Sequence, residues 1–106
     1  MTATTTNILI AGVGGQGIIL SSEILAYSCL NAGYDVKQSE VHGMAQRGGS
    51  VTSHVRFGKR VSSPLIPKGE VDILLAFEQL EALRWIDILK PEGTIIVNQY
   101  AIAPIT

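Results

Sequence analysis

Residues 7–17 read Asn-Ile-Leu-Ile-Ala-Gly-Val-Gly-Gly-Gln-Gly and predict a buried strand followed by a glycine-rich turn. Its apolar residues Ile8, Leu9 and Ile10 follow one another without a polar interruption, which is the pattern of a strand covered on both faces. The glycines after them match G-x-G-x-x-G, in which glycines allow a tight turn, close approach of a ligand and close helix packing. The candidate ligand-binding residues of this turn are Gly12, Gly14, Gly15, Gln16 and Gly17.

A helical pattern at residues 17–32 follows the glycine turn and would direct its N-terminal N–H groups toward an anion there. A dinucleotide also requires an acidic residue at the end of the second strand to hold a ribose hydroxyl. The second strand, residues 34–38, ends in Val-Lys-Gln, and Glu40 is the nearest acid beyond it. We therefore expect NAD and FAD to bind weakly or not at all. Tight packing and binding of another anion both remain open as roles for the glycines.

The rest of the chain continues to alternate strand and helix patterns. Further strands are predicted at residues 51–57, 71–77 and 94–98, and a second helix at residues 78–89. Residues 51–57 alternate apolar and polar side chains, which predicts a half-exposed antiparallel strand, and Val61 begins a short return strand. The expected fold is therefore α/β, a Rossmann-like, mostly parallel sheet with an antiparallel hairpin over residues 50–62. The last strand lacks a covering helix, which indicates a single domain, 1–106, that is incomplete at the C-terminus.

Both predicted helices have an apolar face at helical spacing that should pack on the sheet. In the first helix this face consists of Ile18, Ile19, Leu25, Ala26, Cys29 and Leu30. In the second helix it consists of Leu80, Leu83, Ile86 and Leu89, and the residues expected in water are Glu78, Glu81 and Asp87. Each helix should therefore bury its apolar side chains and expose its polar ones.

Composition limits the class of protein. Apolar residues make up 46% of the 106 residues and charged residues 16%, so the core should be well packed and part of the surface covered by another molecule. No run reaches the ~18 apolar residues that a membrane span needs, and no basic region precedes a signal core, so we expect a cytoplasmic chain without membrane contact. The single cysteine, Cys29, excludes a disulfide framework and any Cys-x-x-Cys metal or iron–sulfur motif within this chain.

The segment at residues 39–50 has no strand or helix period and contains three glycines, which is typical of a functional loop. Gln46 and Arg47 form its most site-like polar pair. Five of the eight basic residues of the chain lie between Glu40 and Glu70, where there is no acid: Arg47, Arg56, Lys59, Arg60 and Lys68. This basic window suits a phosphorylated ligand or an acidic partner, although a solvated hairpin face would explain it too.

Several classes of site are not expected. Nucleic acid is disfavoured by a pI near 6.0 and by the lack of interleaved aromatic residues. His42 and His54 have no carboxylate or cysteine at ligand spacing, so we predict no metal site. No serine has a nucleophile-elbow context, so we predict no catalytic residue in this chain.

Several motifs together carry a resemblance to a known family. They lie at residues 12–17, 39–49, 54–58, 63–67 and 72–78. With them, the chain resembles the gamma-type domain of 2-oxoacid:ferredoxin oxidoreductases over residues 7–100, most closely the branch that acts on indolepyruvate. Family members are longer, so the resemblance identifies the chain as the N-terminal part of such a domain.

The resemblance implies a subunit of a thiamine-dependent enzyme that oxidatively decarboxylates an aryl pyruvate, such as indolepyruvate, to its acyl-CoA thioester. Electrons would pass to ferredoxin, and thiamine diphosphate and the iron–sulfur clusters would sit on a large partner subunit. This chain would bind no cofactor and be inactive alone, contributing interface and the handling of coenzyme A. The interface or ligand residues would be His42, Met44, Gln46, Arg47 and Gly48. Rival interpretations are a stand-alone binding module for a nucleotide-type ligand and a pure assembly domain.

Overall fold

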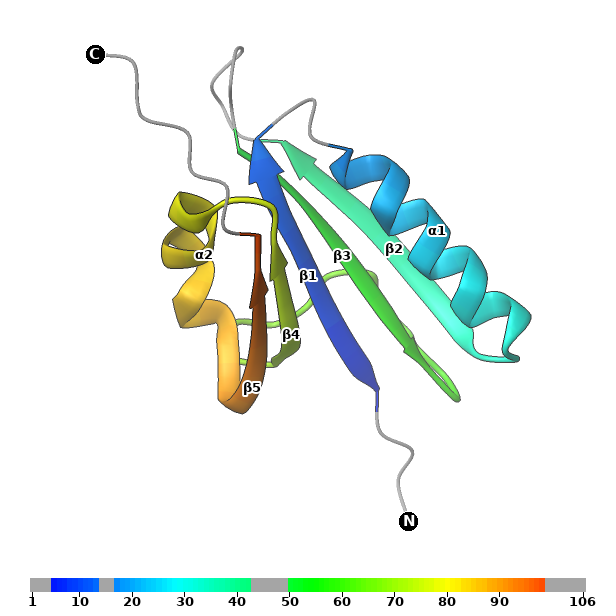
Figure 1. The fold of residues 1–106 in the computed structure, drawn as a ribbon. Coiled ribbons are helices and arrows are strands. Elements are labelled where there is room, and N and C mark those ends of the chain that lie inside the picture. Colours follow the sequence, from blue (N-terminus) through cyan, green and yellow to red (C-terminus); the bar gives the residue numbers. More distant parts are fainter. Residues whose placement is uncertain (1–4, 14–16, 43–49, 99–106) are drawn as a thin grey trace.

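The computed structural model describes residues 5–13, 17–42 and 50–98 of the chain. These residues form a sheet with helices on both of its faces (Figure 1). The elements in chain order are β1 (Thr6–Val13), α1 (Ile18–Asn31), β2 (Asp35–His42), β3 (Ser50–Gly58), β4 (Val71–Ala76), α2 (Gln79–Trp85), the 3-10 helix η1 (Ile86–Ile88) and β5 (Leu89–Val97). The α/β prediction is thus confirmed.

The five strands lie in the order β2-β3-β1-β4-β5. β1 pairs in parallel with β4, and β4 with β5, whereas β3 is antiparallel to both β1 and β2. The sheet is therefore mixed rather than mostly parallel. The predicted return strand at Val61 was wrong, since β3 forms its hairpin with β2 and Val61 lies outside any strand. Residues 43–49 are too few for the parallel crossover of about a dozen residues, so β2 and β3 must run antiparallel.

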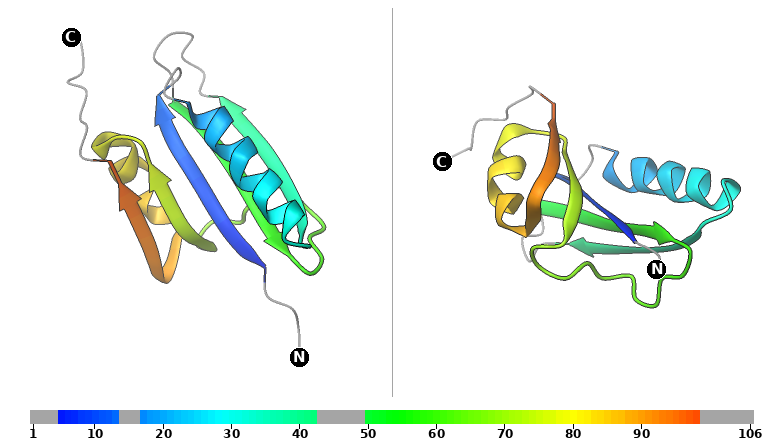
Figure 2. Two further views of the ribbon diagram at one scale, coloured as in Figure 1. Left: turned by 45° about the vertical axis from the view of Figure 1, so that its right-hand side comes forward. Right: turned by 90° about the horizontal axis from the view of Figure 1, so that it is seen from below.

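β1 is buried on both faces, as its apolar run predicted. Ile8 and Ile10 lie in one core cluster with Ile18 of α1, whereas Leu9 and Ala11 lie in a second cluster on the other face. α1 covers the first face, and the second cluster includes Trp85 of α2. The connection from β3 to β4 crosses the face opposite α1 (Figure 2, right).

β3 is more deeply buried than its alternating pattern predicted. Thr52 and His54, expected on an exposed polar face, are 2% and 9% exposed. The connection after β3 covers this face, because Val61 and Ile66 are buried and the Ile66 N–H donates to Nδ1 of His54 at 3.2 Å. This contact joins residues that sequence periodicity cannot relate.

Helix α2 is shorter than predicted, and it turns its leucine side chains outward instead of toward the sheet. It ends at Trp85, η1 follows, and β5 already begins at Leu89. The apolar residues expected against the sheet are exposed: Leu80 is 44%, Leu83 67% and Ile86 46% exposed. Glu78 and Glu81, expected in water, are both buried. Ala82 and Trp85 also turn inward, so the leucine face points away from the described core.

Helix α1 shows a milder form of the same inversion. Ile18, Ala26 and Cys29 are buried as predicted, but Ile19 and Leu30 are exposed. The buried face includes Ser22, whose hydroxyl hydrogen-bonds the hydroxyl of Ser53 and accepts a hydrogen bond from Nε2 of Gln38 at 2.6 Å. The exposed face carries Leu20, Ile24 and Tyr27, at 59–68% exposure. In the described part of the chain, neither helix has the length and apolar content needed to cross a membrane.

Candidate functional site

The carboxyl ends of β1, β2, β4 and β5 lie at one edge of the sheet, which we call the carboxyl edge, and β3 begins there. Val13, the last residue of β1, lies opposite Ser50, the first residue of β3, and His42 lies opposite Val51. The described residues that flank the glycine turn and the loop after β2 therefore meet at this edge. In open α/β sheets, ligands bind outside the carboxyl ends of the strands.

β1 and β4 are neighbours at this edge, but their helices leave in opposite directions. α1 covers the face that carries Ile8 and Ile10, and α2 packs on the face that carries Leu9 and Ala11. Such a divergence between adjacent parallel strands is a topological switch point, the position at which α/β proteins most often bind ligands.

Three of the predicted site residues lie in the described part of the chain. Gly12 is buried inside β1 and pairs with Val51. Gly17 caps α1 with φ 81°, a left-handed conformation that disfavours any residue with a Cβ. Among the described residues, no atom lies within 4 Å of a Cβ built on Gly17, so the left-handed conformation, and not close packing, favours glycine at this position. The backbone of His42 ends β2. The other candidates lie outside the described residues: Gly14, Gly15, Gln16, Met44, Gln46, Arg47 and Gly48.

The sheet order bears on the dinucleotide question. β3 lies between β1 and β2 and is antiparallel to both, so the tip of β2 is not next to the glycine turn. Glu40, the nearest acid, lies within β2 and is exposed. The arrangement therefore does not place an acid at the tip of β2 beside the glycine turn, where a dinucleotide ribose would need it.

Sequence reasoning missed two buried acids at the carboxyl edge. Glu81 of α2 is 2% exposed and fully partnered. Its Oε1 accepts hydrogen bonds from Oγ of Ser50 at 2.5 Å and Nε1 of Trp85 at 3.3 Å, and its Oε2 lies 3.2 Å from Nε of Arg84. Glu81 therefore ties α2 to the start of β3.

Glu78, at the junction of β4 and α2, is equally buried at 2% exposure. Its Oε2 has no hydrogen-bond partner, the one such buried side-chain atom found in the described ranges. The Phe77 N–H donates to the Ala11 carbonyl at 2.9 Å, which extends the β1–β4 pairing and brings Glu78 beside the end of β1. The sequence signal was available, since Glu78 directly follows a buried apolar strand.

The opposite edge, where β1 and β4 begin, we call the amino edge. Asn7 is its centre: its N–H donates to Oδ2 of Asp72 at 2.7 Å, and its Nδ2 donates to the Glu70 carbonyl at 2.9 Å. Its Oδ1 accepts from Nε of Arg56 at 2.9 Å. Lys90 forms an ion pair with Asp72. Each of these groups has a partner within the chain.

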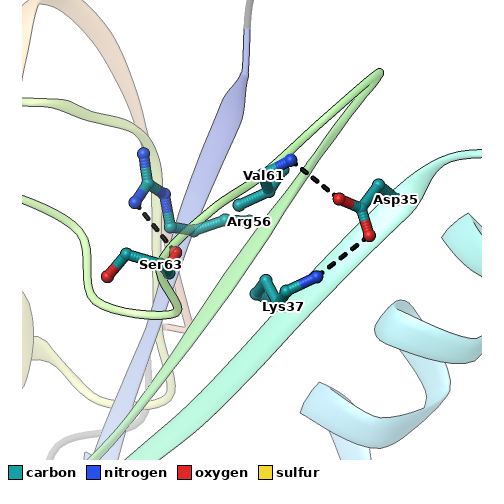
Figure 3. A network of polar contacts seen from close by, with 5 residues as sticks. All are labelled: Asp35, Lys37, Arg56, Val61 and Ser63. Carbon is teal, nitrogen blue, oxygen red and sulfur yellow. Dashed lines mark hydrogen bonds and ion pairs between the residues drawn. The ribbon is translucent and has the colours of Figure 1, made fainter.

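The basic window does not form one surface. Nη1 of Arg56 donates to the carbonyl of Ser63 at 2.9 Å (Figure 3). It also donates to the carbonyl of Leu65 at 2.9 Å, so this guanidinium holds the connection after β3 in place. Lys59 and Arg60 are exposed beyond the end of β3, at the amino edge, which is the far end from the loop after β2. Arg56, Lys59 and Arg60 therefore do not share a surface with the loop after β2.

Asp35 fixes the same connection from the start of β2 (Figure 3). Its Oδ2 accepts from the Val61 N–H at 2.8 Å, and its Oδ1 pairs with Nζ of Lys37 at 3.0 Å. The hydrogen bond from Val61 and then that from Lys37 lower the pKa of the Asp35 carboxyl. This contact is structural, since its partners all lie within the chain.

A cleft of about 410 Å³ lies beside α2, away from the glycine turn, and is lined by Ile66, Lys68, Arg84, Trp85, Asp87 and Ile88. Its charged groups are of both signs, so it favours no single ligand charge.

Within the described ranges, no group of three or more His, Cys, Asp or Glu residues could hold a metal ion. Cys29 is buried on α1, and burial raises the pKa of its thiol, so it is a weak nucleophile.

Several known proteins are similar to this chain in sequence and in fold. The indolepyruvate oxidoreductase subunit IorB of Thermococcus kodakarensis is 48% identical over 99 residues, which are 93% of this chain and 49% of that relative. The structure of the keto/oxoacid ferredoxin oxidoreductase gamma subunit from Geobacter sulfurreducens PCA is similar, with 29% sequence identity and a TM-score of 0.70. The match covers 89% of this chain and 50% of that subunit.

A 2-oxoglutarate:ferredoxin oxidoreductase from Magnetococcus marinus, solved with 2-oxoglutarate, coenzyme A and succinyl-CoA bound, has 26% identity and a TM-score of 0.75. The match covers 94% of this chain and 18% of that one. The chain spans about half the length of the curated relatives it matches. The family profile for pyruvate ferredoxin/flavodoxin oxidoreductase matches residues 7–106, and the chain belongs to this family.

Proposed function

We propose that the chain is part of a subunit of a thiamine-dependent 2-oxoacid:ferredoxin oxidoreductase that acts on aryl pyruvates such as indolepyruvate. The 48% identity to a subunit named for indolepyruvate supports this substrate class. The enzyme would release carbon dioxide, form the acyl-CoA thioester and pass electrons to ferredoxin in the cytoplasm. The role of this chain is to assemble with the large subunit and to help bind coenzyme A.

The inverted helices carry the proposed assembly role. α2 exposes Leu80 and Leu83 and buries Glu81, and α1 exposes Leu20 and Ile24 and buries Ser22. Ile86, directly after α2, is exposed as well, and Glu78, directly before it, is buried. An apolar helix face directed away from its own core marks a surface that another protein covers. We assign both faces to contacts within the oxidoreductase complex.

The carboxyl edge carries the proposed ligand role. The glycine turn, including Gly12 and Gly17, and the loop with Gln46 and Arg47 start from strand ends that meet there. An arginine in this loop suits a phosphate or carboxylate from outside the chain, since guanidinium binds such groups bidentately. Coenzyme A offers phosphates, and it is bound in the Magnetococcus marinus enzyme.

Thiamine diphosphate and the iron–sulfur clusters belong on the partner subunit in this proposal. A cysteine-ligated cluster needs several thiolates, whereas this chain has the single, buried Cys29. Those groups would supply the decarboxylation and the electron transfer. The residues of this chain bind and orient, and we assign none of them a proton or electron transfer.

The test is co-expression of the full-length chain with its large subunit, followed by assay of 2-oxoacid-dependent and coenzyme A-dependent ferredoxin reduction. Ile24→Glu and Leu83→Glu should each abolish co-purification while leaving the melting temperature of the free chain unchanged, because both side chains are exposed. Leu65→Glu is the matched control, an exposed leucine on the connection after β3 that should leave the complex intact. Normal assembly and turnover in both helix variants would refute the assembly role.

A further inference from the structure

Among the described residues, Glu78 carries the buried side-chain oxygen that has no hydrogen-bond partner. It is 2% exposed, and its Oε2 makes no hydrogen bond. Glu81, three residues later and equally buried, is bonded by Ser50, Trp85 and Arg84. A buried acceptor without a donor destabilises the native state and calls for an explanation in function. Packing does not supply one, because an apolar residue would fill this place at lower cost.

The position of Glu78 points to a ligand. The hydrogen bond from Phe77 to Ala11 brings it beside the end of β1, at the switch point between β1 and β4. It precedes α2 on the face opposite α1. Groups that contact ligands in open α/β sheets lie at this kind of junction, so the unpartnered oxygen and the topology agree.

The electrostatics on the two sides of β1 differ. On the α2 side lie Glu78 and Glu81, and the nearby cation Arg84 is already bound to Glu81. A phosphate is disfavoured there by like charge. On the other side, the first turn of α1 contains no acidic residue, and its N–H groups and dipole favour an anion.

We infer that Glu78 accepts a hydrogen bond from an uncharged donor of coenzyme A, an amide N–H or hydroxyl of its pantetheine arm, while the phosphates lie on the α1 side. This inference rests on the proposed function. In this inference Glu78 reaches the ligand by a rotamer change, which its three side-chain torsions and its place between β4 and α2 allow. Because Oε2 gives up no hydrogen bond in that change, the new bond is a net gain.

The inference is tested in the complex of the full-length chain and its large subunit, with Glu78→Leu compared to wild type. Coenzyme A and pantetheine serve in turn as the thiol substrate, and adenosine 3′,5′-bisphosphate serves as a competitive inhibitor. Glu78→Leu should lower kcat/KM about tenfold for both thiols, the effect of losing one charge-assisted hydrogen bond, and leave the inhibition constant unchanged. The melting temperature should rise, because the unpaired buried acceptor is gone.

Glu70→Gln is the control, since it removes an exposed carboxylate at the amino edge and should leave every value unchanged. Unchanged kcat/KM for both thiols in Glu78→Leu overturns the inference, and so does a raised inhibition constant for the bisphosphate with pantetheine unaffected. A lower melting temperature with wild-type kinetics also overturns it, since Glu78 would then be structural. Failure of the proposed function is separate, because the wild-type complex would show no 2-oxoacid-dependent turnover.

Discussion

The two edges of the sheet differ in how completely their polar groups are paired. At the amino edge, Asn7 uses its N–H, Nδ2 and Oδ1, and Arg56 bonds Asn7 and two carbonyls. At the carboxyl edge, Glu81 is paired but Glu78 leaves a buried oxygen without a donor. Paired groups fix the fold, whereas an unpaired buried group retains capacity for a partner. The difference supports a structural role for the amino edge and the ligand role that we propose for the carboxyl edge.

The largest effect is predicted for a substitution that removes the hydrogen bonds of Arg56 at the amino edge. Arg56→Met leaves Asn7 Oδ1 and the carbonyls of Ser63 and Leu65 without their donor, so we expect a loss of roughly 3 kcal/mol in the free energy of unfolding. Urea denaturation of the full-length chain measures it. Arg60→Met, an exposed control, should change stability by less than ~0.5 kcal/mol. A loss below ~1 kcal/mol for Arg56→Met would show that the amino edge is not what fixes the connection.

A second prediction uses two glutamates of equal burial and opposite pairing. Glu81→Leu removes the acceptor of Ser50 and Trp85 and should cost about 2 kcal/mol, whereas Glu78→Leu should stabilise by up to ~1 kcal/mol. The difference in sign is the informative quantity, and chemical denaturation of both variants gives it. If both changes destabilise equally, the contrast in pairing has no energetic meaning.

A third prediction concerns backbone conformation at the carboxyl edge. Gly17→Ala places a Cβ at φ 81° and should cost about 1 kcal/mol, although the space around it is open. Gly17→Asn should cost less, because Asn tolerates the left-handed region better. Thermal melts of the two variants decide the matter. An Ala variant as stable as wild type would mean that the turn adopts another conformation.

The smallest predicted effect is the contribution of His54 on β3 to the pH dependence of stability. Burial, and then the charge of Arg56, lower the pKa of His54, which accepts a hydrogen bond from Ile66. The unfolded chain then binds the proton more readily than the native one. This part of the stability is present above pH ~6.5 and is lost as pH falls toward the lowered native value.

His54→Asn keeps a side-chain acceptor but does not titrate, so its unfolding free energy should fall less steeply than that of wild type between pH 7 and 5. Parallel urea titrations at each pH make the comparison. Equal slopes for the two proteins would show that His54 does not contribute to the acid sensitivity.

Much of the fold was predictable from local pattern. The apolar run of β1 predicted a strand buried on both faces, and the helical pattern after Gly17 predicted α1. The burial of Thr52 and His54 on β3 was not predicted, because residues 61–66 cover them through long-range contacts. The length of residues 43–49 did contain the signal for the β2–β3 hairpin.

The sequence predicted where the candidate site lies but not that Glu78 and Glu81 are buried there. The carboxyl ends of parallel strands share one edge, so strand direction alone brings the starts of the glycine turn and of the loop after β2 together, and the described flanking residues lie there. The outward face of α2 was missed because helical spacing shows that Leu80 and Leu83 share a side without showing which side meets the core. For the same reason Glu78 and Glu81 were placed in water.

Hydrogen–deuterium exchange of the full-length chain, free and in complex with its large subunit, tests the division between the edges most directly. The account predicts protection on binding in peptides that cover residues 17–31 and 77–86, which carry the outward helix faces and the two glutamates. Peptides that cover residues 56–63 and 69–73, at the amino edge, should exchange equally in both states. Protection confined to the amino-edge peptides would contradict the account.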